Sequence, residues 1–233
     1  MSQTKKLVFG YWGVGASATP IRMLFHYLKI DYENKTILPH EWGALKKQYL
    51  SDPSTPFPNM PHLYDPEEDF LLTETLAIPY YICSKYNRLD LFGETPVEQG
   101  RVRQLEAVIN DLMPHYFAPI FGPEPKAKFE QNVQPGAGPV ALVGQISKAI
   151  GEKQFITGKL TYADLKAAHL LYAYRAILKN FGVEDPISQH ENLIGYIKGV
   201  RGLEEFRDFN DGENDLPLLA EQQLPGFQEF KLW

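Results

Sequence analysis

The 233-residue chain is 44% hydrophobic and carries a net charge of −6, which excludes wholesale disorder and argues against nucleic acid as the main partner. Its single cysteine, Cys83, excludes an internal disulfide framework and a Cys-x-x-Cys redox pair. The apolar residues 7–12 are too few for a signal-peptide core or a membrane span. We therefore expect a cytoplasmic protein with no membrane partner.

The first third of the chain alternates strand and helix patterns. Residues 7–11 form a short run of strand-forming residues, and residues 20–28 have apolar positions at helical spacing. Residues 31–38 predict a second strand, which is parallel to the first if the helix between them is a crossover. After an irregular connection, two short strands at 61–64 and 70–72 flank a polar turn and so predict a hairpin.

A helix predicted over residues 76–86 completes the order β-α-β, connection, β-β-α, a four-stranded mixed sheet with helices packed against it. Residues 89–98 are polar and turn-prone and are interpreted as a linker. Strand patterns end there, and a Gly/Pro-rich loop is expected at 135–139. The helices predicted beyond the linker cover residues 99–113, 141–150, 162–178 and 193–199. The sequence therefore predicts an α/β domain over 1–88 and an all-α domain over 99–233.

Two candidate binding positions flank the predicted hairpin. Pro61 follows a loop and opens a strand, so it is either an ordinary proline or one with a cis peptide bond, which would turn the main chain of Met60 outward. An extended peptide could pair with that main chain. Thr75 is a good N-cap for the next helix, whose first N–H groups attract carboxylates, and Glu74 offers an acceptor for an ammonium group. A purely structural cap is the alternative.

Trp42 and Lys46 are four residues apart and would share one face if their segment is helical. An ammonium beside an indole N–H can bind a carboxylate. The alternative interpretation is a solvated lysine beside a partly buried tryptophan, which is the more common outcome for such a pair taken alone.

Other residues have simpler interpretations. Tyr11, at the end of the first strand, is by itself a core aromatic with a hydroxyl that reaches the surface. Residues 161–164 resemble a capping box with Asp in place of Glu or Gln, a structural feature. Cys83 is expected to be buried and inert. His26 and His115 have no cysteine or carboxylate at metal-ligand spacing, so we predict no metal site.

Taken together and in this order, the patterns resemble the cytosolic glutathione transferases, most of all the mu class. The resemblance covers nearly the whole chain and is strongest in the first 90 residues. It implies a thioredoxin-like N-terminal domain followed by an all-α domain. Its matching segments are Gly10-Tyr11-Trp12, Ile21-Arg22, Trp42 with Lys46, Phe57-Pro58-Asn59-Met60-Pro61, Thr73-Glu74-Thr75 and Leu160-Thr161-Tyr162-Ala163-Asp164.

The resemblance implies a detoxifying enzyme that joins the glutathione thiolate to hydrophobic electrophiles. In it, the Tyr11 hydroxyl would donate to the glutathione sulfur, and Met60, before a cis Pro61, would pair with the cysteinyl unit. The other residues implied to bind glutathione are Trp12, Trp42, Lys46 and Asn59, with Glu74, Thr75 and the partner subunit's Asp111 at the γ-glutamyl end.

The resemblance also implies a homodimer, because Phe57 matches an aromatic residue that inserts into the partner subunit. The electrophile itself cannot be read from the sequence, but its pocket is expected to have apolar walls. Those walls would include the tail that ends at Trp233. The other expected lining residues are Val14, Met113, Tyr116, Phe117 and Phe121.

Several positions depart from the mu-class pattern. Gly15 stands where those enzymes carry an arginine near the sulfur, and Phe121 falls where some carry a second tyrosine, with Tyr116 nearby. Glu74 and Thr75 replace a glutamine and a serine. The chain is therefore described as mu-like.

Ser17 is a rival to Tyr11, since other branches of the superfamily use a serine in this turn. The interval from Tyr11 to Arg22 is 11 residues, as expected of the tyrosine-type enzymes, and it favours Tyr11. Two rival functions also remain at this stage: a non-catalytic binding or structural protein on the same fold, and a glutathione-dependent isomerase.

Overall fold

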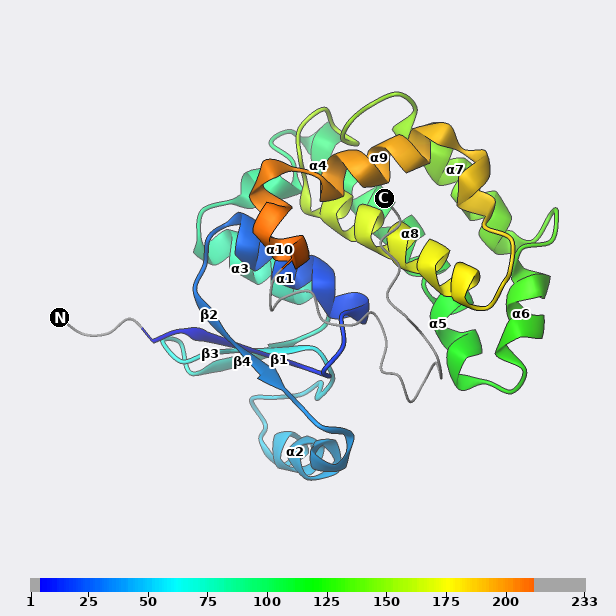
Figure 1. The fold of residues 1–233 in the computed structure, drawn as a ribbon. Helices are drawn as coiled ribbons and strands as arrows, with labels where there is room; N and C mark the ends of the chain where they lie inside the picture. The colour runs from blue at the N-terminus through cyan, green and yellow to red at the C-terminus, as the bar shows by residue number, and fades with distance from the viewer. Residues whose placement is uncertain (1–4, 212–233) are drawn as a thin grey trace. The chain divides into compact units, whose positions relative to one another are not determined.

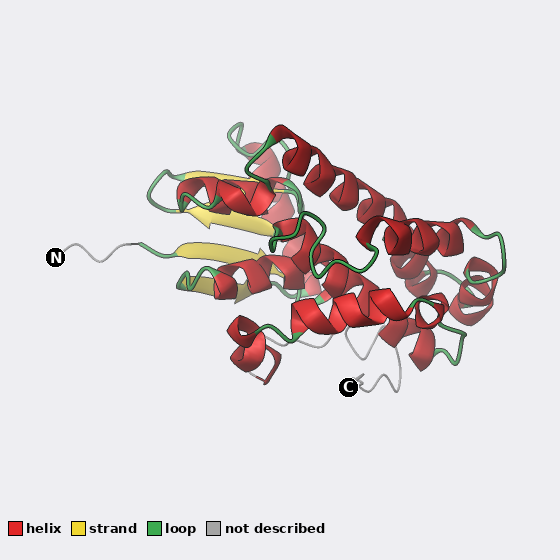
Figure 2. Cartoon of the chain, turned by 90° about the horizontal axis from the view of Figure 1, so that it is seen from above, coloured by secondary structure: helices red, strands yellow, loops and turns green. Residues whose placement is uncertain are grey.

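The computed structural model describes residues 5–211. Its contacts divide them into two compact units, one made of the residues up to Arg88 together with those from Asp208 on, and one spanning Leu89–Arg207. Every strand described lies in the first unit, and the regular elements of the second are helices (Figure 2). The predicted fold class, α/β followed by all-α, is confirmed.

The first unit is built on a four-stranded mixed sheet with the order β2-β1-β3-β4 (Figure 1). β2 runs parallel to β1, β3 runs antiparallel to β1, and β3 and β4 form the predicted antiparallel hairpin. The strands are β1 (Leu7–Tyr11), β2 (Tyr32–Thr36), β3 (His62–Asp65) and β4 (Phe70–Thr73).

The helices of this unit lie on both sides of the sheet. α1 (Thr19–Tyr27) and α3 (Ala77–Lys85) lie on one face, and α2 (Pro39–Ser51) lies on the other (Figure 1). α1 turns an apolar stripe toward the sheet, so that the ring centroids of Phe9 and Phe25 are 5.9 Å apart. The short helix α10 (Arg207–Asp211) also reaches this unit, where Phe209 contacts the His26 ring.

Two predictions about this unit need correction. The connection before β3, predicted to be irregular, contains α2. None of the side chains of α2 is buried, so the sequence has no strong apolar stripe there to indicate a helix. Thr75 is not the cap of α3 either, because the N-cap position is Leu76, which makes no side-chain capping bond.

Gly10 and His62 pair β1 with β3 where the end of β1 meets the start of β3. The two residues are directly paired across the strands, and the buried His62 ring lies on the Gly10 backbone. A Cβ at position 10 would fall 2.2 Å from the His62 Cε1 and Nε2 atoms, so only glycine fits there. Burial, helped by the nearby Lys35 charge, lowers the pKa of His62 to about 4 and keeps the ring neutral.

The second unit is organised around α8, which is buried along most of its length and packs against α4 and α9. Asp164 occupies the third position of its capping box, as the sequence predicted. The helices of this unit are α4 (Pro96–Leu112), α5 (Pro114–Phe121), α6 (Pro125–Asn132), α7 (Gly138–Ile150), α8 (Tyr162–Asn180) and α9 (Glu191–Arg201).

The segment interpreted as a linker is partly helical. Leu89–Phe92 form a 3₁₀ turn, and α4 begins at Pro96 because Thr95 caps it. α7 begins at Gly138, inside the predicted loop. α5 and α6 are absent from the sequence predictions, because prolines interrupt that region and each helix is only eight residues long. None of the helices over residues 5–211 combines the length and apolar character needed to cross a bilayer.

Candidate functional site

Tyr11 ends β1 with its side chain 7% exposed, and its hydroxyl lies 3.0 Å from the Oγ of Ser17. Ser17 sits in the middle of the 3₁₀ turn Ala16–Ala18, which leads directly into α1. Ala16 has a φ of 40°, a conformation that folds the turn back toward the strand end. The two rival residues of the sequence analysis are therefore hydrogen-bonded neighbours.

Arg22 anchors this turn from inside the unit. Its side chain is 1% exposed and donates from Nη1 to the Val14 carbonyl at 3.0 Å and from Nε to Asn34 Oδ1 at 3.2 Å. The guanidinium carbon lies 5.8 Å from the centroid of the Tyr11 ring. The 11-residue interval noted in the sequence thus brings a buried cation beneath the tyrosine ring.

The Tyr11 hydroxyl keeps its proton at neutral pH. Burial raises the pKa of Tyr11, and the hydrogen bond with the Ser17 side chain, the Arg22 charge and the Ser17 backbone N–H oppose that effect without cancelling it. A neutral phenol carries one proton to donate and two lone pairs to accept with.

A chain of aromatic contacts leads from Tyr11 to Lys46. The ring centroids of Tyr11 and Trp12 are 6.5 Å apart, and those of Trp12 and Trp42 are 6.0 Å apart. The Lys46 ammonium lies 6.0 Å from the Trp42 ring centroid, so the pair does share one face of a helix. Lys46 is exposed, and both tryptophans are partly exposed.

The loop before β3 lies against the end of β4. The Met60–Pro61 peptide bond is cis. The Met60 N–H donates to Asn59 Oδ1 at 2.9 Å, and Asn59 Nδ2 donates to Glu74 Oε1 at 3.2 Å. Asn59 and Glu74 are both exposed, so an amide and a carboxylate from two separate loops meet at the surface.

Phe57 projects from the same loop. Its side chain is 72% exposed, while its carbonyl accepts from the Thr73 hydroxyl at 2.6 Å. The backbone is therefore fixed and the ring is free to meet another surface. Thr75 lies next to this junction and is half-buried.

The remaining predicted residues divide between the two units. Val14 is buried in the first, while Asp111, Met113, Tyr116, Phe117 and Phe121 belong to the second. Tyr116 is fully buried against the Tyr174 ring, with its hydroxyl unpaired among the residues described, and burial raises its pKa well above the usual range. Phe121 is 66% exposed and Asp111 is exposed. The predicted tail ending at Trp233 lies outside the described residues.

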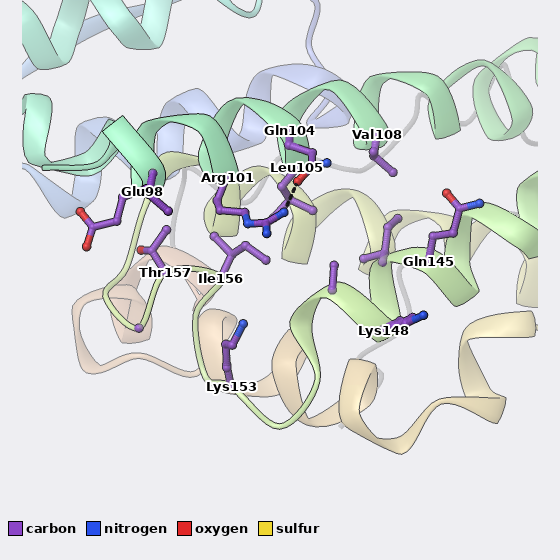
Figure 3. Close-up of a pocket in the computed structure, with 14 residues that line it drawn as sticks. Glu98, Arg101, Gln104, Leu105, Val108, Gln145, Lys148, Lys153, Ile156 and Thr157 are labelled. Carbon is purple, nitrogen blue, oxygen red and sulfur yellow. Dashed lines mark hydrogen bonds between the residues drawn. The ribbon is translucent and has the colours of Figure 1, made fainter. Parts of the chain in front are cut away.

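A groove that the sequence did not indicate runs between α4 and α7 (Figure 3). Its volume is about 720 Å³. Val97, Leu105, Val108, Ile146 and Ile156 give it apolar walls, and basic side chains line its edge at Arg101, Lys148 and Lys153. No sequence signal could have joined these residues, because they come from two helices and a loop spread over 62 positions, from 97 to 158.

Over residues 5–211, no group of three or more His, Cys, Asp or Glu side chains is arranged to hold a metal ion. Cys83 is buried in α3, as predicted. The chemistry that these residues can supply is therefore hydrogen bonding from Tyr11 and Ser17, backbone pairing at Met60 and the charges of Lys46 and Glu74.

Known proteins share both the sequence and the fold. Residues 7–84 match the family described as Glutathione S-transferase, N-terminal domain. Glutathione S-transferase 2 of Gallus gallus is 30% identical over 212 residues, which cover 85% of this chain and 87% of that protein. Glutathione S-transferase Mu 1 of Bos taurus is 27% identical over 236 residues, covering 97% and 98%. The solved structure of the glutathione S-transferase Blo t 8 has a TM-score of 0.71 at 23% identity, covering 91% of this chain and 96% of that one. The chain therefore belongs to the glutathione S-transferase family of enzymes.

Proposed function

We propose that this enzyme conjugates glutathione to small hydrophobic electrophiles, with the Tyr11 hydroxyl stabilising the thiolate. The observation that carries the proposal is a buried, protonated phenol at the end of β1, a strand whose Gly10 pairs with His62 just after the cis Met60–Pro61 bond. The loop that contains this bond also joins Asn59 to Glu74 at the surface. A thiol has a pKa of about 8.5, and lowering it by about two units takes about 2.7 kcal/mol. One charge-assisted hydrogen bond with nearby backbone dipoles is enough for that.

In this reaction the glutathione thiol releases its proton to solvent, and Tyr11 donates a hydrogen bond to the sulfur anion. A sulfur electron pair then forms the bond to the electrophilic carbon, and the leaving group departs with the electrons of its own bond. Tyr11 keeps its proton throughout. Holding sulfur and electrophile in one orientation supplies the rest of the acceleration.

Glutathione would lie along the first domain, residues 1–88. Met60 would pair with the cysteinyl unit, while Glu74, Thr75 and the partner subunit's Asp111 would hold the γ-glutamyl ammonium and carboxylate. The glycine carboxylate would be bound by the Lys46 ammonium, the indole N–H groups of Trp12 and Trp42, and the exposed side-chain amide of Asn59.

The electrophile would be held by the helical domain, residues 99–233, joined through residues 89–98. We propose Met113, Phe117 and Phe121 of this domain as its apolar contacts, with Phe121 as the most exposed of them, together with Val14 of the first domain. The fully buried Tyr116 would act there only through packing. A mu-like class, a detoxifying role and a cytoplasmic location complete the proposal. The matches to curated mu-class proteins, such as Mu 1 of Bos taurus, support the class.

The test of this function is a pair of measurements on the purified protein. We expect one glutathione bound per chain by calorimetry, and conjugation of glutathione to a generic aryl halide. Glutathione bound with no turnover would instead indicate a non-catalytic binding protein. Glutathione required but not consumed, with an unsaturated substrate rearranged, would indicate the isomerase.

We also propose a homodimer in which the partner subunit's Phe57 enters the groove between α4 and α7. An exposed aromatic on a fixed backbone and an apolar-walled groove of about 720 Å³ are complementary features, and both are present on one chain. A dimer of this kind would also bring Asp111 to the partner's glutathione.

Phe57→Ala should weaken the dimer about thirtyfold or more, since a central aromatic anchor typically contributes at least about 2 kcal/mol. Sedimentation equilibrium measures the dissociation constant directly. Leu50→Ala is the matched control, because Leu50 is also strongly exposed, at 63%, but lies at the end of α2. Equal dissociation constants for the two variants would remove Phe57 from the interface.

A further inference from the structure

We propose that Ser17 is a positioning residue that acts through Tyr11: its hydroxyl donates to the Tyr11 oxygen, which leaves the Tyr11 proton to point at the glutathione sulfur. The proposal rests on the function proposed above and adds a second residue to its thiolate site. It also resolves the competition between the two hydroxyls that the sequence left open.

The 3.0 Å contact between the two hydroxyls permits two arrangements, because either oxygen could be the donor. In the first, Tyr11 donates to Ser17, and the only proton left for a ligand is that of Ser17. In the second, Ser17 donates to Tyr11, and the phenol proton is left for the ligand. The two arrangements therefore differ in which hydroxyl, that of Ser17 or that of Tyr11, donates a hydrogen bond to the glutathione sulfur.

The backbone of the turn favours the second arrangement. The Ser17 main-chain N–H helps to lower the pKa of Tyr11, as a donor that faces the phenol oxygen does, and an N–H can only donate. When both the amide and the hydroxyl of Ser17 donate toward the Tyr11 oxygen, they use its lone pairs and leave its single proton for a ligand.

The turn is held firmly enough to keep this geometry. Ala16 and Ala18, on either side of Ser17, are buried. Just before them, the Val14 carbonyl accepts from Arg22 at 3.0 Å. Ser17 itself is half-buried, so its hydroxyl is partly shielded from competing water. A hydroxyl that accepts a hydrogen bond becomes a better donor, so Ser17 strengthens the bond that Tyr11 gives to sulfur.

The experiment is a double-mutant cycle of Ser17→Ala and Tyr11→Phe, read out by the ultraviolet absorbance of bound thiolate against pH. Ser17→Ala should lower the thiolate fraction near neutral pH about threefold to tenfold, as expected for one neutral hydrogen bond. Glutathione affinity should fall by no more than about fourfold, the loss that linkage to the thiolate requires, and Ser17→Thr should restore the thiolate. In the Tyr11→Phe background, Ser17→Ala should have no further effect. Ser54→Ala is the control, because Ser54 bonds to Asp52 on an exposed loop.

The proposal would be overturned if the effects of the two substitutions on the thiolate fraction were additive, or if Ser17→Ala lowered that fraction more than Tyr11→Phe does. Either result would make Ser17 a direct donor to the sulfur. No effect of Ser17→Ala would overturn it as well. A second readout does not depend on turnover or on glutathione. In the ligand-free protein, Ser17→Ala should move the Tyr11 phenol titration to higher pH, with Tyr11→Phe identifying that signal. An enzyme that fails to conjugate but shows this shift would refute the proposed function and leave the Ser17–Tyr11 arrangement intact.

Discussion

Tyr11→Phe is expected to lower the turnover number for conjugation about a hundredfold, the usual cost of removing one donor to a developing anion. The substitution removes only the hydroxyl. Its ring would remain 5.8 Å from the Arg22 guanidinium and in contact with Trp12, so the glutathione-binding surface should keep its shape. Affinity for glutathione should therefore stay within about threefold, because the peptide is held mainly by other groups.

Steady-state kinetics with saturating glutathione, together with calorimetry for affinity, would measure both effects. Tyr64→Phe is the matched control: it removes another tyrosine hydroxyl of the same sheet, one that bonds to Asp69 on the exposed side. Full turnover in Tyr11→Phe would show that the thiolate is stabilised elsewhere. A loss of affinity as large as the loss of turnover would show that Tyr11 binds the peptide and does not serve the transition state.

The sheet could be predicted from the sequence because its strands carry strong local signals. The run at residues 7–11 and the polar turn between residues 64 and 70 mark β1 and the hairpin by composition alone. α2 carries no such signal, because it buries none of its side chains and the apolar periodicity that indicates a helix comes from burial. α5 is short and contains Pro119, which local rules count against a helix.

The site could be predicted only where one residue carries the chemistry. The position of Tyr11 at a strand end follows from the run of strand-forming residues. Its hydrogen bond with Ser17 depends on a positive φ at Ala16, which cannot be predicted because alanine rarely adopts that conformation. Likewise, the sequence around Gly10 does not indicate that the His62 ring lies on its backbone. Contacts between distant segments are set by packing, and one sequence does not encode them locally.

Asp164 should be the most sensitive polar residue of the helical unit. Its side chain is fully buried, and its carboxylate accepts four hydrogen bonds from three segments. Oδ1 accepts from the Ile156 N–H at 2.9 Å and the Tyr196 hydroxyl at 2.8 Å. Oδ2 accepts from the Thr161 N–H at 2.9 Å and its hydroxyl at 2.6 Å. One residue thus ties the start of α8 to the preceding loop and to α9.

Asp164→Ala is therefore expected to destabilise the protein by about 3–5 kcal/mol, because it leaves several buried donors without an acceptor. Asp164→Asn should fall between that variant and the wild type, since its amide keeps one oxygen but turns N–H groups toward two donors. Urea unfolding followed by circular dichroism, at one fixed protein concentration, measures the difference.

The matched control for this prediction is Thr95→Ala, which removes the cap of α4. There Thr95 Oγ1 accepts from the Glu98 N–H at 3.2 Å on an exposed turn, where water can replace the lost partner. Its cost should be about 1 kcal/mol. The two substitutions alter the same kind of motif at the start of two helices, so the difference between them measures what burial and the additional hydrogen bonds of Asp164 contribute together. Equal shifts in the unfolding midpoint would mean that Asp164 is worth no more than an ordinary helix cap, and that its bonds to Ile156 and Tyr196 contribute nothing to holding α8 and α9 together.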